Sequence, residues 1–128
     1  MKAVLDTHAV IWALENDNRL GVKARKLIEN VQTKELAISD ITLLEISSLN
    51  HKDRVRLNVS TEEYLRKIET LFVVVPINAH ISATAFQVAL PHGDPFDRVI
   101  VATAAFLKLP IVTRDGNITR SGVHDVVW

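Results

Sequence analysis

The chain has 128 residues, which fits one domain over residues 1–128 and leaves little room for a second. Hydrophobic residues make up 48% of it, so we expect a globular protein, and the lack of cysteine excludes disulfides, thiolate catalysis and cysteine-ligated zinc. Lys plus Arg and Asp plus Glu number 15 each, so the overall charge does not indicate a nucleic-acid partner, although acids gathered in one pocket would leave the remaining surface net basic.

Short apolar runs alternate with amphipathic segments through the first half of the chain. The first run ends in Asp6, and Thr7 is a candidate cap for the helix that follows it. The expected elements are, in order, a strand over 2–6, helices over 8–16 and 22–31, a strand over 35–39, a helix over 40–50 with Asp40 as N-cap, a basic turn region over 51–59, and a helix over 60–71 with Ser60 and Glu63 as a capping box.

The second half continues the alternation. Residues 72–77 are β-branched and apolar, which predicts a central strand. The expected elements after it are a helix over 79–90, a polar link over 91–94, a helix over 95–107, a strand over 110–113, a turn over 114–117 and a strand over 123–128. Strands that alternate with helices indicate an α/β domain with a parallel sheet.

No segment is suited to a membrane. The longest apolar segment, Val99 to Val112, contains Lys108 and Pro110 and is shorter than the ~20 residues of a membrane span. Asp6 interrupts the N-terminal apolar run, which makes it a poor signal peptide. We therefore expect a soluble cytoplasmic protein without membrane association.

Two acids follow predicted strands. Asp6 ends the first strand and Asp115 follows the strand over 110–113. Ligands of open parallel sheets bind beyond the carboxyl ends of the strands, so both positions favour a site. The alternatives are local: Asp6 as the cap of the next helix, and Asp115 as a turn former before Gly116.

Two further acids lie on apolar helix faces. Glu45 is predicted to lie in the middle of an arc formed by Ile41, Leu44, Ser48 and Leu49, where a solvated glutamate is not expected. The alternative for Glu45 is a buried ion pair.

Asp97 heads the stripe Ile100, Val101 and Ala104. The alternative for Asp97 is a role in the helix start, because Asp94, Pro95 and Asp97 have the layout of a cap, a proline at N1 and an acid at N3. Asp94 is accordingly predicted to be a cap rather than a ligand.

These four carboxylates predict a metal site. Crowded carboxylates repel one another and resist ionisation, and a hard divalent cation such as Mg²⁺ or Mn²⁺ relieves that repulsion. The predicted metal ligands and catalytic residues are Asp6, Glu45, Asp97 and Asp115. The chemistry that such a site favours is metal-assisted phosphoryl transfer.

At these residues the chain resembles the PIN domain family, and within it the VapC-type toxins. The resemblance runs through LDTHAVIWAL, ISDITLLEIS, HGDPFDRVIVATA and IVTRDGNI to the closing VVW, in that order, and covers essentially the whole chain. It implies a three-layer α/β/α fold with a central, mostly parallel sheet. It also implies metal-dependent cleavage of RNA phosphodiesters, a cognate antitoxin partner and a toxin homodimer.

The resemblance also assigns neighbours of the acids. Thr7 and Thr113 match hydroxyl residues that hold carboxylates in place, and we predict both, together with Arg98, to contribute to substrate binding. An ion pair with a neighbouring acid is the alternative for Arg98. The basic stretch over 51–56 receives no role from the resemblance, and Trp12 and Trp128 are predicted to be core or interface residues.

Other classes of function fit less well. Haloacid-type phosphatases need a second aspartate where this chain has His8, receiver domains need paired acids after the first strand, and no glycine-rich phosphate loop is present. The five histidines lack a ligand spacing, which argues against a two-histidine ribonuclease. A non-catalytic module that binds metal or a partner remains the alternative to the nuclease.

Overall fold

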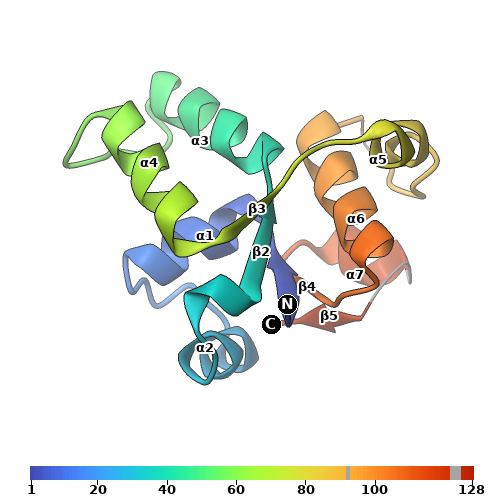
Figure 1. Cartoon of the computed structure of the whole chain (residues 1–128), viewed down its shortest axis with the longest axis horizontal. Coiled ribbons are helices and arrows are strands. Elements are labelled where there is room, and N and C mark those ends of the chain that lie inside the picture. Colours follow the sequence, from blue (N-terminus) through green and yellow to red (C-terminus); the bar gives the residue numbers. More distant parts are fainter. Residues whose placement is uncertain (92, 122–124) are drawn as a thin grey trace.

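Five parallel strands form the centre of the protein in a computed structural model, which describes residues 1–91, 93–121 and 125–128 (Figure 1). The strands are β1 (Ala3–Leu5), β2 (Leu36–Ser39), β3 (Val73–Val75), β4 (Ile111–Val112) and β5 (Val126–Val127). Their order in the sheet is β3-β2-β1-β4-β5, and every neighbouring pair is parallel. The predicted parallel sheet is thus confirmed.

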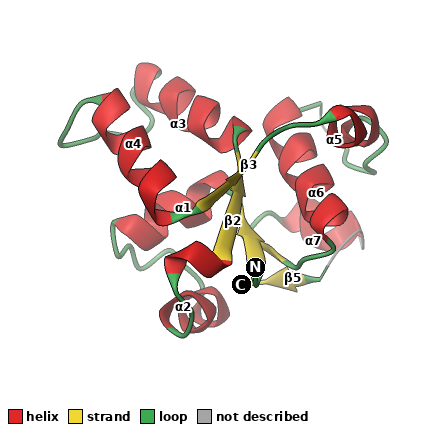
Figure 2. Cartoon of the chain, viewed as in Figure 1, coloured by secondary structure: helices red, strands yellow, loops and turns green. Residues whose placement is uncertain are grey.

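Helices cover both faces of this sheet (Figure 2). They are α1 (Thr7–Leu14), α2 (Val22–Glu29), α3 (Ile41–His51), α4 (Thr61–Leu71), α5 (Ala79–Ala85), α6 (Pro95–Leu107) and α7 (Gly116–Ser121), with a short 3₁₀ turn over Thr33–Glu35. Helices α1 to α4 lie on one side of the sheet and α5 to α7 on the other. The arrangement is the three-layer α/β/α fold that the resemblance implied. Within the described residues, no helix is long and apolar enough to span a membrane.

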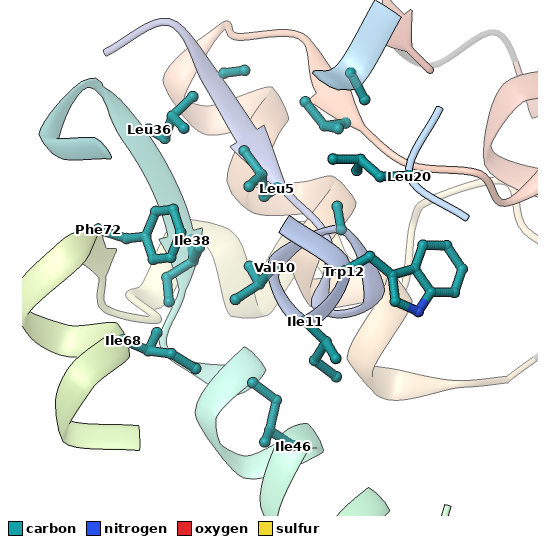
Figure 3. Close-up of a cluster of buried hydrophobic side chains, with 14 residues drawn as sticks. Leu5, Val10, Ile11, Trp12, Leu20, Leu36, Ile38, Ile46, Ile68 and Phe72 are labelled. Carbon is teal, nitrogen blue, oxygen red and sulfur yellow. The ribbon is translucent and has the colours of Figure 1, made fainter. Parts of the chain in front are cut away.

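The strand residues alternate between the two layers. Leu5 and Ile38 pack with the first layer of helices around Val10 and Ile68, as Figure 3 shows. Val4 of β1 faces the other way and packs in the cluster that α6 supplies. Such strands, buried on both faces, are apolar throughout, which is why short runs in the sequence located them.

The position of β3 in the sheet differs from the prediction. The apolar run over 72–77 was expected to form a central strand, but β3 lies at the edge of the sheet beside β2. Its first two residues are only half-buried. β-Branched composition predicts a strand, but it does not fix the place of that strand in the sheet.

The helix predicted over 79–90 is also shorter than expected and ends at Ala85. Beyond α5, the guanidinium of Arg98 on α6 donates to the main-chain carbonyl oxygens of Val88 (2.8 Å) and Leu90 (3.1 Å). Pro91 disfavours helical backbone at Leu90. These contacts hold the segment after α5 against α6.

Several helix starts differ in detail from the sequence prediction. Asp6 rather than Thr7 caps α1, with its Oδ1 accepting a hydrogen bond from the Ala9 amide at 2.9 Å. Asp40 makes no cap bond, whereas Ser60 does accept from the Glu63 amide as predicted. The turn predicted over 114–117 instead opens helix α7, and the start of the strand predicted over 123–128 lies outside the described residues, as do His92 and His124.

Candidate functional site

A pocket of about 360 Å³ opens where β1 and β4 end. These two strands are neighbours in the middle of the sheet, and β2 lies on the other side of β1. Open parallel sheets bind ligands at such a point, where the strand order changes direction. The pocket is lined by Asp6, His8, Trp12, Arg19, Glu45, Asp94, Asp97, Arg114 and Asp115. All four predicted acids therefore meet in one pocket, and Asp94 joins them.

Asp6 is held by contacts on both carboxylate oxygens. Its Oδ1 accepts from the Ala9 amide, and its Oδ2 accepts from the Thr113 hydroxyl at 2.5 Å. Burial raises the pKa of Asp6 above its usual value, although these two hydrogen bonds oppose the rise. The cap role and the pocket position coexist, because one oxygen serves the helix while the side chain still lines the cavity.

Glu45 is half-buried on α3 and accepts from the Thr7 hydroxyl at 2.5 Å. The Thr7 and Thr42 hydroxyl oxygens lie 3.3 Å apart. Burial raises the pKa of Glu45, with smaller contributions from the charges of Asp94 and Asp6. Among the described residues no cation forms an ion pair with Glu45, so the buried ion pair considered above is absent there.

The face of α3 differs from the predicted arc. Leu44, expected beside Glu45 on the apolar side, has 62% of its surface exposed, whereas Thr42 and Ile46 are fully buried. The helix is therefore rotated relative to the prediction, and Glu45 lies at the border of the buried face. That border position lets its carboxylate reach the pocket.

The pKa of Asp97 is also strongly raised. Burial, followed by repulsion from Asp94, Glu45, Asp115 and Asp6, raises the pKa of Asp97 to about 7. Asp97 lies in the first turn of α6, which Asp94 caps by accepting from the Phe96 amide at 2.9 Å. Asp94 is a cap, as predicted, and it also lines the pocket.

Asp115 is tied to Asp6 through Thr113. The Thr113 hydroxyl donates to Asp6 and accepts from the Asp115 amide at 3.0 Å. The Asp115 Oδ1 accepts from the amides of Asn117 (2.7 Å) and Ile118 (3.1 Å) at the start of α7. A buried threonine thus couples the acids at the ends of two neighbouring strands.

The donor set fits a hard divalent cation. Carboxylate oxygens are the ligands that Mg²⁺ and Mn²⁺ prefer, and a bound cation would relieve the mutual repulsion that, after burial, raises the pKa of Asp97. Within the described residues no three Asp, Glu or His side chains already converge on one metal position. Threonines and main-chain amides hold the carboxylates of Asp6, Glu45 and Asp115 in the pocket.

The three predicted substrate-binding residues have different surroundings. Thr7 and Thr113 are buried, and their hydroxyls face carboxylates. Arg98 is not among the residues that line the pocket, and its guanidinium holds the loop after α5. Direct contact of these three with substrate stays a prediction.

Two residues that line the pocket, Arg19 and Trp12, were not predicted to lie there. Trp12 was predicted to be a core or interface residue, and only 4% of its surface is exposed, but it also lines the pocket. Arg19 lies in a polar turn without a distinguishing pattern, so nothing local marked it.

Known proteins resemble the whole chain. The PIN domain family profile matches residues 3–122. Ribonuclease VapC22 of Mycobacterium tuberculosis (strain ATCC 25618 / H37Rv) is 34% identical in an alignment of 131 residues in length. The alignment covers 98% of this chain and 97% of that protein.

Solved structures agree with this match. A toxin-antitoxin complex from Klebsiella pneumoniae contains a chain that is 22% identical with a TM-score of 0.68, covering 99% of this chain and 97% of that one. VapBC-1 from nontypeable Haemophilus influenzae is 18% identical with a TM-score of 0.70, and the match covers 98% and 96% of the two chains. At these identities the likeness shows the fold.

Proposed function

Because this chain belongs to the PIN domain family, we propose that it is a metal-dependent endoribonuclease and the toxin of a toxin–antitoxin pair. The observation that carries the proposal is the pocket that gathers Asp6, Glu45, Asp97 and Asp115 at the carboxyl ends of β1 and β4. The relative named as a ribonuclease supports it, because the match spans nearly the full length of both chains. The proposed nuclease domain comprises residues 1–128.

The four acids would hold Mg²⁺ or Mn²⁺. A divalent ion supplies Lewis-acid polarisation of the scissile phosphate and lowers the pKa of the attacking water. Thr113 and Thr7 orient Asp6 and Glu45 for this task, since each hydroxyl fixes one carboxylate oxygen. Burial and the neighbouring acids raise the pKa of Asp97 to about 7, so Asp97 would have to lose its proton to hold a metal ion, and metal binding should strengthen as the pH rises through that value.

The same pocket supports an antitoxin as a binding partner. A cavity rich in carboxylates is a natural receptor for an arginine side chain, and a cognate antitoxin would block the site in this way. The resemblance to complexes described as toxin-antitoxin supports an antitoxin partner. We further propose a homodimer and a cytoplasmic location, where RNA and antitoxin are both available.

The test is cleavage of a mixed tRNA and rRNA pool by protein freed of antitoxin, with Mn²⁺ or Mg²⁺. We expect discrete fragments that disappear with EDTA and in the Asp97→Asn variant. Asp53→Asn is the matched control, because Asp53 is exposed on the turn after α3 and does not line the pocket. Metal binding without any cleavage would contradict the nuclease and favour a non-catalytic binding module.

A further inference from the structure

A second hollow adjoins the acid pocket on the outer side of α1. It has a volume of about 160 Å³ and is lined by His8, Ile11, Trp12, Glu15, Arg19, Arg54, Val55 and Arg56. It shares His8, Trp12 and Arg19 with the acid pocket, so the two cavities adjoin at these side chains. We call it the basic hollow, because Arg19, Arg54 and Arg56 face one acid, Glu15.

The turn that carries Arg54 and Arg56 is fixed by its main chain. Asn50 Nδ2 donates to the Val55 carbonyl oxygen at 2.9 Å, and the Val55 side chain packs against the core. Both arginine side chains are exposed, and among the described residues neither forms an ion pair. Two cations thus lie next to the pocket, and within the described residues no carboxylate is at ion-pair distance from either.

Trp12 holds two more cations at the junction of the cavities. The guanidinium carbon of Arg19 lies 5.0 Å from a ring centroid of Trp12, and that of Arg114 lies 4.6 Å from it. Trp12 lies at the edge of the core cluster in Figure 3, and Trp128 packs against its ring at 5.8 Å. A cation within 6 Å of an indole ring is attracted to its face, so both guanidinium groups have a fixed support.

Asp17 further orients Arg19, whereas Arg114 has no such carboxylate partner within the described residues. The Arg19 Nε and Nη2 donate to the two carboxylate oxygens of Asp17 at 3.0 and 2.8 Å. This leaves the remaining N–H groups of the guanidinium available to an anion. Arg114 forms no ion pair within the described part of the chain.

We propose that the basic hollow binds the phosphate next to the scissile one on a single-stranded RNA, with Arg114 beside Trp12, which lines both cavities. The inference rests on the proposed nuclease function and extends it to the path of the substrate. A strand that places one phosphate at the acids must place its neighbours close by, and the acid pocket repels them. The guanidinium groups of Arg54, Arg56 and Arg114, which form no ion pair in the described residues, attract these neighbouring phosphates. Proteins commonly bind a single strand along a positively charged groove.

The experiment compares two double variants that each remove two cations. Arg54→Gln/Arg56→Gln alters the basic hollow, whereas Arg66→Gln/Lys67→Gln alters exposed positions on α4 that line neither cavity. Binding of a fluorescent single-stranded RNA of about 12 nucleotides is measured by anisotropy in EDTA, which prevents cleavage, over a series of salt concentrations. Labelled poly-glutamate serves as a second polyanion.

We expect Arg54→Gln/Arg56→Gln to weaken RNA binding about 10-fold and to reduce the slope of log affinity against log salt by about 0.7, the value for one lost phosphate contact on a single strand. In cleavage assays the KM should rise while kcat changes little, because neither arginine lines the acid pocket. The Arg66→Gln/Lys67→Gln control should bind like the parent.

Three results would overturn the proposal. If the parent binds and cleaves RNA but both double variants behave alike, the basic hollow is not the phosphate site and the nuclease function stands. If the parent neither binds nor cleaves RNA, the proposed function fails and this inference fails with it. If Arg54→Gln/Arg56→Gln loses poly-glutamate binding more strongly than RNA binding, the hollow recognises acidic protein segments instead.

Discussion

Thr113 is the residue on which the geometry of the acid pocket depends most directly, and Thr113→Val tests this. The residue is fully buried, and its hydroxyl donates to Asp6 and accepts from the Asp115 amide. Valine has nearly the same shape but no hydroxyl. The variant therefore removes both hydrogen bonds with little change in packing.

The expected cost follows from these two contacts. A hydrogen bond to a charged group contributes roughly 1.5–3 kcal/mol, and a buried amide left without a partner costs about 1 kcal/mol or more. We expect Thr113→Val to lower the free energy of unfolding by about 2–4 kcal/mol at pH 7. Loss of the hydrogen bond from Thr113 favours protonation of Asp6. If Asp6 becomes protonated, the loss of stability should lie at the lower end of this range.

Two matched variants calibrate the result. Thr103 is also fully buried, but its hydroxyl donates at 2.7 Å to the Val99 carbonyl inside α6, so Thr103→Val should cost only about 1 kcal/mol. Thr113→Ser keeps the hydroxyl and should recover most of the stability. The assay is urea unfolding with EDTA, followed by calorimetric titration with Mn²⁺, whose affinity should fall about 10–100-fold in Thr113→Val. A cost for Thr113→Val no larger than that for Thr103→Val would refute the reasoning.

Three further predictions concern the charge of the pocket and one close contact. Because the folded pKa of Asp97 is raised to about 7, its contribution to stability is present at low pH and is lost as the pH rises through that value, so in EDTA the urea midpoint should fall between pH 5 and pH 8. Asp97→Asn should make the urea midpoint less dependent on pH. It should also stabilise the metal-free protein at pH 8 by about 1 kcal/mol, after allowance for solvent screening. Asp53→Asn should change neither the pH dependence nor the stability. Mn²⁺ at about 100 times its Kd should stabilise the parent by about 2.7 kcal/mol in thermal unfolding but leave Asp97→Asn unaffected, and equal shifts would argue against Asp97 as a ligand. Gly21→Ala should cost about 1–3 kcal/mol in urea unfolding, because an added Cβ would collide with the main chain and ring of Trp128, while Gly93→Ala, with open space around it, should stay within about 0.5 kcal/mol of the parent; equal costs would contradict the steric explanation.

Local signals in the sequence located the strands and the acids. Buried parallel strands are short continuous apolar runs, so β1, β2 and β4 were visible without any structure. Helix α6 was predicted over the residues it occupies, because the Asp94 cap and Pro95 at its first position are strong local start signals. The acids that follow strands could be grouped because parallel strands end at the same edge of the sheet.

Features that depend on long-range contacts were decided only by the folded chain. The hydrogen bonds from Arg98 to the carbonyl oxygens of Val88 and Leu90 hold the segment after α5, and no pattern within residues 79–90 indicates them. The edge position of β3 depends on which strands pair, because composition does not specify neighbours.

The residues that line the two cavities were likewise placed partly by local signals and partly by long-range contacts. The sequence by itself located Asp6 and Asp115 after strands and Asp97 in the first turn of a helix, because strand ends and helix starts are local properties. Only the tertiary structure brought the turn of Arg54 and Arg56 beside α1 and placed Arg19 and Arg114 over Trp12. Those contacts join segments far apart along the chain, and their geometry arises from packing that no local pattern encodes.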